Sequence, residues 1–292
     1  MTIDLGGRTA LVTGAGGGLG RAHALLLARA GARVIVNDIP HSGAKAESVV
    51  DEIRSAGGRA EAIAASVTDE AAVADMVGQA GAIDILVNNA GILRDKSFAK
   101  MSIEEFRQVV DVHLMGSVIC TKAVWDGMRE RNHGRIVMTT SSSGLYGNFG
   151  QSNYGAAKMA LVGLMQTLSL EGAKYNIRVN ALAPTAATGM TEGLMPPTML
   201  DLFRSELVSP ALLALVAEEA PSRTILCAGA GGVEQAQVTL TRGLSIAGLD
   251  GLEAAQLILD RLGEIGDPAT ATIPQAGLEQ AQLEVAKASA TR

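Results

Sequence analysis

Cysteine is scarce in this sequence, with only Cys120 and Cys227 among 292 residues. The two lie far apart and have no metal-ligand spacing, so we predict buried free thiols, no disulfide framework and no metal site. The chain also lacks an apolar run of about 18 residues and a basic-then-apolar leader. We therefore expect a cytoplasmic protein with no membrane partner.

Charge of one sign is not concentrated anywhere along the chain. The formal net charge is −6 and Lys and Arg form no cluster, so electrostatics gives no argument for a nucleic-acid partner. Charged residues are 18% of the chain and hydrophobic residues 48%, a balance that excludes a disordered polymer. With 292 residues the chain is long enough to bury one large α/β core.

Strand-like and helix-like patterns alternate along most of the chain. The predicted strands are 9–12, 33–36, 60–65, 83–87, 135–139 and 178–182, and the predicted helices are 21–30, 43–56, 69–80, 102–130 and 153–172. This order predicts an α/β protein with a single-domain, Rossmann-like, doubly wound parallel sheet and helices on both faces. We expect this domain to span residues 1–235. Residues 236–292 are expected to form a helical extension that packs on the domain or on a partner subunit.

A glycine turn follows the first predicted strand, in the run Thr13-Gly14-x3-Gly18-Leu19-Gly20. The run lies between a strand and a helix of a βαβ unit, which is the context that a dinucleotide-binding motif requires. Gly14 permits the tight turn, and Gly18 and Gly20 let the backbone approach a pyrophosphate closely. The free N–H groups and the dipole at the helix N-terminus favour the same anion.

Asp38 ends the second predicted strand, where the adenosine ribose of a dinucleotide is expected to lie. Its carboxylate can accept both ribose hydroxyls and would repel a 2′-phosphate. No Lys or Arg at positions 15–17 or 39 offsets that repulsion. We therefore predict NAD as the cofactor, although an acid at a strand end also serves as an ordinary turn residue.

Three residue types that handle a proton on a carbonyl or alcohol occur together later in the chain. Tyr154 and Lys158 are four residues apart and share one helix face, and Ser141 lies thirteen residues before the tyrosine. A free tyrosine has a pKa of about 10, too high for a base near neutrality. The Lys158 ammonium and an oxidised nicotinamide are expected to lower that pKa. With the glycine turn, this set predicts a hydride-transfer enzyme.

These motifs, together with Asn88-Asn89-Ala90-Gly91, resemble the short-chain dehydrogenase/reductase family over about residues 5–232. The resemblance implies that Tyr154 is the catalytic acid/base and that Ser141 orients the substrate oxygen. It also implies that Lys158 binds the nicotinamide ribose and lowers the pKa of the tyrosine.

The resemblance implies further cofactor contacts beside those of the glycine turn and Asp38. The expected residues are Ser66, Val67, Asn89, Ala90, Gly91, Pro184 and Thr188. Ser66 stands where the family commonly has an acid near the adenine, so Val67 is expected to contribute through its backbone. Pro184 and Thr188 are expected on the nicotinamide side.

Three runs, 91–98, 112–117 and 144–154, resemble one branch of the family more closely. They look like the (3R)-hydroxyacyl-CoA dehydrogenase part of peroxisomal multifunctional enzyme type 2, a group in which some members also oxidise 17β-hydroxysteroids. The resemblance implies an NAD-dependent enzyme that interconverts a (3R)-hydroxyacyl-CoA and a 3-ketoacyl-CoA. The alternatives are a dehydrogenase for a hydroxysteroid or another bulky alcohol, and a non-catalytic dinucleotide-binding protein.

His113 stands at the position of the family's usual catalytic asparagine, as a histidine does in the closer branch. Two roles are open for it. One is a proton relay behind Lys158, with titration near the ordinary imidazole pKa of about 6.5. The other is a packed side chain that shapes its helix.

The predicted helix 153–172 carries small residues that permit close helix approach, namely Ala156, Ala157, Ala160 and Gly163. In the resembling family this helix commonly pairs across a two-fold axis. The resemblance therefore implies a homodimer or a homotetramer.

Overall fold

Eight strands form one sheet in the order β3-β2-β1-β4-β5-β6-β7-β8. The computed structural model describes residues 3–187 and 201–290. The strands are β1 Thr9–Val12, β2 Arg33–Asp38, β3 Arg59–Ala64, β4 Ile85–Asn88, β5 Gly134–Thr139, β6 Ile177–Thr185, β7 Ile225–Gly229 and β8 Gly232–Ala236. The first seven are parallel to their neighbours, which confirms the predicted doubly wound sheet. The antiparallel edge strand β8 was not expected.

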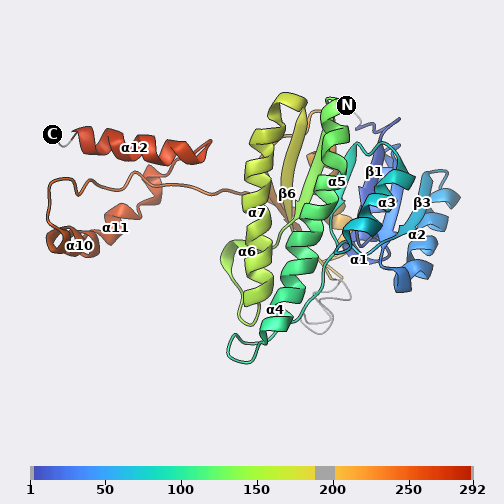
Figure 1. The fold of residues 1–292 in the computed structure, drawn as a ribbon, viewed down its shortest axis with the longest axis horizontal. Coiled ribbons are helices and arrows are strands. Elements are labelled where there is room, and N and C mark those ends of the chain that lie inside the picture. The colour runs from blue at the N-terminus through green and yellow to red at the C-terminus, as the bar shows by residue number, and fades with distance from the viewer. Residues whose placement is uncertain (1–2, 188–200, 291–292) are drawn as a thin grey trace. The chain divides into compact units, whose positions relative to one another are not determined.

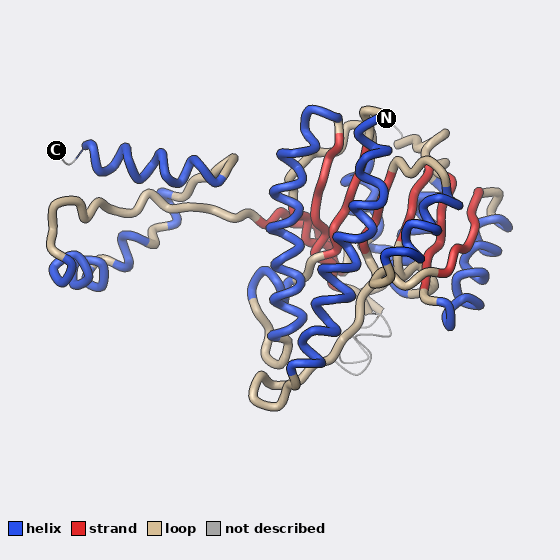
Figure 2. The backbone as a smooth tube through the Cα atoms, viewed as in Figure 1, coloured by secondary structure: helices blue, strands red, loops and turns tan. Residues whose placement is uncertain are grey.

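Helices cover both faces of this sheet (Figures 1 and 2). They are α1 Gly18–Arg29, α2 Gly43–Ser55, α3 Glu70–Ala80, α4 Ile103–Val110, α5 Gly116–Glu130, α6 Ser142–Tyr146, α7 Ser152–Gly172 and α9 Ser209–Val216. Figure 1 shows α5 and α7 lying across one face of the strands. The short helix α6 has no counterpart in the predicted helices.

Alternate residues of the central strands divide between two cores. Along β1, Ala10 and Val12 pack with α1, α2 and α9, whereas Leu11 packs with α3, α5 and α7. Successive side chains of a strand point to opposite faces, so both sets must be apolar when both faces are covered. The strand segments of the sequence are continuously apolar because helices cover both faces of the sheet.

The predicted helix 102–130 is interrupted by one wide turn. It begins with a capping box between Ser102 and Glu105, and residues Asp111–Met115 form a π-helical turn between α4 and α5. Such turns insert an extra residue into a helix and often occur at functional sites. This turn contains His113, so it changes the direction of a candidate site residue.

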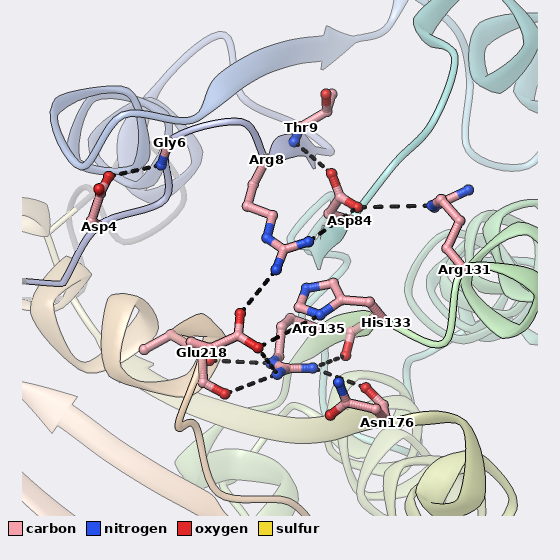
Figure 3. A network of polar contacts seen from close by, with 12 residues as sticks. Asp4, Gly6, Arg8, Thr9, Asp84, Arg131, His133, Arg135, Asn176 and Glu218 are labelled. Carbon is pink, nitrogen blue, oxygen red and sulfur yellow. Dashed lines mark hydrogen bonds and ion pairs between the residues drawn. The ribbon is translucent and has the colours of Figure 1, made fainter.

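A polar network closes the amino ends of the parallel strands (Figure 3). Its centre is Arg135 of β5, whose side chain is fully buried. The guanidinium donates hydrogen bonds to the carbonyl oxygens of Gly134, Asn176, Ala217 and Glu218 at 2.8–3.1 Å. Burial lowers the pKa of Arg135 to about 10, so the side chain is still charged at neutral pH. The network thus fixes the segment after α9 against β5 and β6.

The contacts of the chain separate into two units, Met1–Ala236 and Gln237–Arg292. The second unit contains α10 Gly251–Asp260, α11 Leu262–Ile265 and α12 Gly277–Ala290. A bridge between Leu240 and Thr272 joins its first segment to the stretch before α12, and Lys287 Nζ donates to the Arg242 carbonyl oxygen at 2.8 Å. Within the described part of the chain, no helix has the length and apolar character needed to cross a membrane.

We predict that Arg135→Met lowers the free energy of unfolding by about 2–4 kcal/mol, because it leaves four carbonyl acceptors without their donor. Urea denaturation measures this loss. Arg129→Met is the matched control, since Arg129 makes a surface pair with Asp126. It should leave the stability nearly unchanged. Equal urea midpoints for wild type and Arg135→Met would show that the network does not stabilise the fold.

Candidate active site

The glycine turn lies at the carboxyl ends of the strands, where the strand order reverses on either side of β1. In open α/β sheets this is the crevice in which ligands bind. Gly14 has φ +62°, and a Cβ there would lie 2.9 Å from Ala90 Cα. A Cβ on Gly20 would lie 2.3 Å from the Gly14 carbonyl oxygen. Only glycine therefore lets the turn pack so closely against α1 and the segment after β4.

The outer part of the turn is open. Gly17 and Gly18 are exposed, and a Cβ on Gly17 would meet nothing within 4 Å. Leu19, the next residue of α1, is half-buried and packs against the core below the turn. Backbone N–H groups at the start of α1 are thus available to an anion, as the dinucleotide hypothesis requires.

Thr13 fixes the turn to the segment after β4. Its hydroxyl accepts hydrogen bonds from the backbone N–H groups of Asn89 and Ala90, both at 3.0 Å. In return, Asn89 Nδ2 donates to the carbonyl oxygens of Thr13 and Gly14 at 2.8 and 3.2 Å. The sequence analysis quoted Thr13 within the motif but did not include it among the site residues. The sequence feature that could have pointed to this role is the position of the threonine directly before the first glycine of the turn.

Asp38 turns its carboxylate toward the glycine turn. Oδ2 accepts the backbone N–H of Gly16 at 2.9 Å, and Oδ1 accepts that of Ile39 at 2.8 Å. A Cβ on Gly16 would lie 2.6 Å from Oδ2, so glycine is needed for this approach. A carboxylate offers about four acceptor positions, so two backbone bonds leave capacity for ribose hydroxyls.

The other expected cofactor residues differ in their surroundings. Ser66 Oγ lies 2.9 Å from Thr68 Oγ1, and the Val67 side chain is buried against Gly116 at the start of α5. The side chain of Val67 is therefore not available to a ligand, and a backbone contact stays a prediction. Pro184 lies within β6, beside Ala228 of β7. Thr188 lies outside the described residues.

Ser141, Tyr154 and Lys158 meet beyond the carboxyl end of β5. Ser141 is the N-cap of α6, and its hydroxyl forms a hydrogen bond with Tyr154. Lys158 is 3% exposed, and its Nζ donates to the Thr139 carbonyl oxygen at 2.5 Å. The same Nζ lies 5.5 Å from the centre of the Tyr154 ring. The structure therefore brings the three predicted residues together, Ser141 from the N-cap of α6 and the other two from α7.

Burial decides the protonation behaviour of this group. Burial raises the pKa of Tyr154, and the hydrogen bond from Ser141 opposes that rise. Burial also lowers the pKa of Lys158 to about 7. The Lys158 ammonium and an oxidised nicotinamide together were expected to lower the pKa of Tyr154; the protein by itself raises it, mainly through burial and further through the Asp95 charge. Sequence spacing gives the reach of the two side chains and not their hydration.

His113 packs against Tyr154, with the ring centres 5.1 Å apart and the planes at 85°. Its Nε2 is 2.8 Å from the carbonyl oxygen and 3.1 Å from the backbone nitrogen of Ile92. A Cβ on Gly91 would lie 2.2 Å from the His113 ring, so this glycine makes room for the imidazole. His113 Nδ1 is buried and finds no hydrogen-bond partner among the residues that the structure describes.

The surroundings of His113 oppose the titration near pH 6.5 that the sequence suggested. Burial lowers its pKa to about 3, and the nearby Lys158 charge acts in the same direction. The imidazole is then neutral across the pH range in which most enzymes work. A relay role for His113 stays a prediction, whereas its packing between Gly91 and Tyr154 is observed.

Comparison with known proteins agrees with this geometry. Residues 8–197 match the family model for short chain dehydrogenases. A short-chain type dehydrogenase/reductase of Mycobacterium tuberculosis is 46% identical over 278 residues, 91% of this chain and 96% of that protein. The peroxisomal multifunctional enzyme type 2 of Drosophila melanogaster is 49% identical over 220 residues, which are 73% of this chain and 37% of that protein.

Solved structures of similar proteins also match the fold of this chain. The full-length Drosophila enzyme matches with a TM-score of 0.83 and 36% identity, over 99% of this chain and 51% of its own. A 7α-hydroxysteroid dehydrogenase, complexed with NADH and 7-oxo glycochenodeoxycholic acid, matches with a TM-score of 0.73 and 30% identity. That match covers 79% of this chain and 96% of the other.

The fold and these relatives define an oxidoreductase that acts on a CH–OH group. The chain belongs to the short-chain dehydrogenase/reductase family. It spans only about a third of the Drosophila enzyme, so the activities of that longer protein do not transfer as a whole.

We predict that His113→Asn leaves the shape of the pH–rate profile unchanged between pH 5 and 9, because one neutral group replaces another. Its kcat should stay within about threefold of wild type. His113→Ala should lose roughly tenfold, since it removes the packing beside Tyr154 and small displacements near the chemistry are costly. Steady-state kinetics over this pH range tests both. An acid limb near pH 6.5 that disappears in His113→Asn would instead support the relay.

Proposed function

We propose that this protein is an NAD-dependent dehydrogenase that interconverts a (3R)-hydroxyacyl-CoA and a 3-ketoacyl-CoA. The observation that carries the proposal is the convergence of Ser141, Tyr154 and Lys158 beside the crevice of the glycine turn. The choice of substrate is supported by the 49% identity to the Drosophila multifunctional enzyme.

A dinucleotide fits the crevice on two counts. The glycine turn leaves open space outside Gly17, and Asp38 lies behind Gly16 with acceptor capacity to spare. A bound nicotinamide would supply the acceptor for the hydride that leaves the alcohol carbon. On the substrate side, Tyr154 as phenolate accepts the hydroxyl proton while the C–O bond becomes a carbonyl. Ser141 Oγ–H donates to the same oxygen and holds it in place.

Lys158 supports the tyrosine by its charge below its pKa of about 7, and this support weakens as the pH rises above that value. Its Nζ is fixed by the Thr139 carbonyl at 2.5 Å and lies 5.5 Å from the phenol ring, so its charged form favours the phenolate. Because burial raises the pKa of Tyr154, alcohol oxidation should speed up as the pH rises toward that pKa. Carbonyl reduction needs the protonated phenol and should slow down over the same range.

A hydroxysteroid is the second candidate substrate. The observation that favours it is the likeness to the 7α-hydroxysteroid dehydrogenase, at 30% identity. A non-catalytic dinucleotide-binding protein is the third possibility, and the assembled Ser141–Tyr154–Lys158 group argues against it. Rates with (3R)-hydroxyacyl-CoA, (3S)-hydroxyacyl-CoA and a hydroxysteroid separate the three.

We also propose a homodimer or homotetramer that pairs through α7. On this helix Ala156 and Gly163 are exposed, and so are the apolar side chains of Met159 and Leu170. Ala157 is buried in the protomer and belongs to no such surface, contrary to expectation. A cytoplasmic location stays a prediction, and the Drosophila relative is peroxisomal by name.

Tyr154→Phe should lower kcat by about 10²–10⁴-fold, because it removes only the oxygen that carries the proton. The affinity for NAD, measured by fluorescence titration, should change little. Tyr175→Phe is the matched control, since the Tyr175 hydroxyl bonds Arg129 at the surface and should be dispensable. A Tyr154→Phe enzyme with half the wild-type activity would refute the assignment of the acid/base.

The wild type should prefer NAD over NADP by at least roughly tenfold in kcat/KM, about 1.4 kcal/mol. Asp38→Asn should narrow this preference, because it removes the charge that repels a 2′-phosphate and keeps an acceptor for the Gly16 N–H. Asp38→Ala should narrow it too, and should also weaken NAD because the turn loses that bond. Equal kcat/KM for both cofactors in the wild type contradicts the prediction.

A further inference from the structure

Gln151 connects three segments next to the candidate catalytic group. It is 8% exposed and is the N-cap of α7. Its Nε2 donates to Asp95 Oδ2 at 2.6 Å. Its Oε1 accepts from Ser143 Oγ at 2.7 Å and from Asn148 Nδ2 at 3.0 Å. One side chain thus joins the segment after β4, the helix α6 and the start of α7.

Each of these connections leads to a residue of the proposed chemistry. Ser143 donates its backbone N–H to Ser141 Oγ at 3.2 Å, so fixing Ser143 also fixes the Ser141 hydroxyl. The Gln151 carbonyl accepts the Gly155 N–H at 2.7 Å and opens the helical turn that contains Tyr154. Gln151 therefore connects to the Ser141 hydroxyl through its side chain and to the turn of the Tyr154 phenol through its backbone carbonyl.

The third segment is held independently at two points. Asn153, fully buried, donates from Nδ2 to the Arg94 carbonyl oxygen at 3.1 Å. The backbone N–H of Lys96 donates to the Gly150 carbonyl oxygen at 2.9 Å. Asp95 lies between these two contacts and is itself exposed, so it presents a fixed carboxylate to Gln151.

The chemistry of this position requires an amide. Two donors meet Oε1 and one acceptor meets Nε2, and only Asn and Gln present an acceptor oxygen and an NH2 donor on one planar group. A glutamate would place two carboxylates at hydrogen-bond distance, and a methionine would leave all three partners without a bond. Two carboxylates at this distance repel each other and the methionine side chain makes no such bonds, so neither change can leave the arrangement intact.

We infer that Gln151 is a positioning residue that, anchored on Asp95, fixes the Ser141 hydroxyl relative to the Tyr154 phenol. The inference rests on the proposed roles of Ser141 and Tyr154. It assigns no contact with substrate to Gln151. It predicts that Gln151 and Asp95 act as one unit. The loss of kcat caused by a substitution at one position should then depend on the residue at the other.

The charge of Asp95 gives a second, measurable consequence. It contributes to the raised pKa of Tyr154, after burial, whereas the bond with Ser141 lowers it. Among the residues that the structure describes, the other ionisable groups around the phenol are Lys158 and His113. Of the charges next to Asp95, Lys96 is paired with Glu105 at 2.5 Å and Arg94 donates to the Leu93 carbonyl oxygen. Removing the Asp95 charge should therefore lower the pH at which the rate of alcohol oxidation rises.

The test compares four variants with wild type by kcat, KM, NAD affinity and pH–rate profile: Asp95→Asn, Gln151→Glu, Gln151→Met and the double variant Asp95→Asn/Gln151→Glu. Gln151→Glu and Gln151→Met should each lose about 10–100-fold in kcat, with NAD affinity nearly unchanged. Asp95→Asn should keep most of kcat and should shift the rise of the oxidation rate to lower pH. The double variant should regain at least about tenfold over Gln151→Glu, because the asparagine amide introduced by Asp95→Asn can donate to the new carboxylate.

A readout without cofactor or substrate is the phenol titration. The chain has three tyrosines. Replacing Tyr146 and Tyr175 by Phe leaves Tyr154 as the only phenol. Ultraviolet absorbance then follows the ionisation of Tyr154 directly. Adding Asp95→Asn should lower the pH at which the phenolate forms. Thermal melting of every variant shows whether the fold is kept.

The outcomes are distinct. If wild type is active and Tyr154→Phe is not, but both Gln151 variants match wild type, the positioning role is wrong and the proposed function stands. If Gln151→Glu loses activity only in step with its melting temperature and the double variant restores nothing, Gln151 is merely structural and the inference is overturned. If Tyr154→Phe equals wild type, or wild type oxidises none of the proposed substrates, the proposed function fails and the inference fails with it.

Discussion

The close approach between the glycine turn after β1 and the segment after β4 is the constraint on which the rest of the site depends. Gly14 lies so near Ala90 that a single methyl group would separate them, and the Thr13 hydroxyl holds the two backbones in that position. The next residue, Gly91, is in contact with the His113 ring, which in turn packs against Tyr154. A change at the turn is therefore transmitted to the catalytic side by direct contacts.

The same region contains groups that reduce stability. Lys158 is buried with a pKa of about 7, and its ordinary value is 10.5. Between these values the unfolded chain binds more protons than the folded one, so this lysine destabilises the fold at neutral pH, and its cost falls as the pH rises. The buried imidazole of His113 leaves Nδ1 without a described partner. Such costs are common where a site needs particular proton affinities.

At the opposite end of the sheet, burial also lowers the pKa of a base, but that base is more fully paired. There Arg135 is buried as well, but its guanidinium has four carbonyl partners and stabilises the joint between β5, β6 and the segment after α9 (Figure 3). Polar groups at the amino ends of the strands are thus fully paired, while those at the carboxyl ends keep open positions. The division agrees with a fold whose ligands bind at the carboxyl edge.

The sequence by itself determined what depends on short spacing. Six of the strands, most of the helices, the glycine turn and the shared helix face of Tyr154 and Lys158 follow from period, turn chemistry and a separation of four residues. The tertiary structure decided what depends on distant partners and on solvent. It alone joins Gln151 to Asp95 across 56 residues and pairs β8 antiparallel at the edge. It also removes water from Tyr154, Lys158 and His113 and so sets their pKa values. Hydration is a property of the whole fold, so local spacing predicts which side chains meet and not how they titrate.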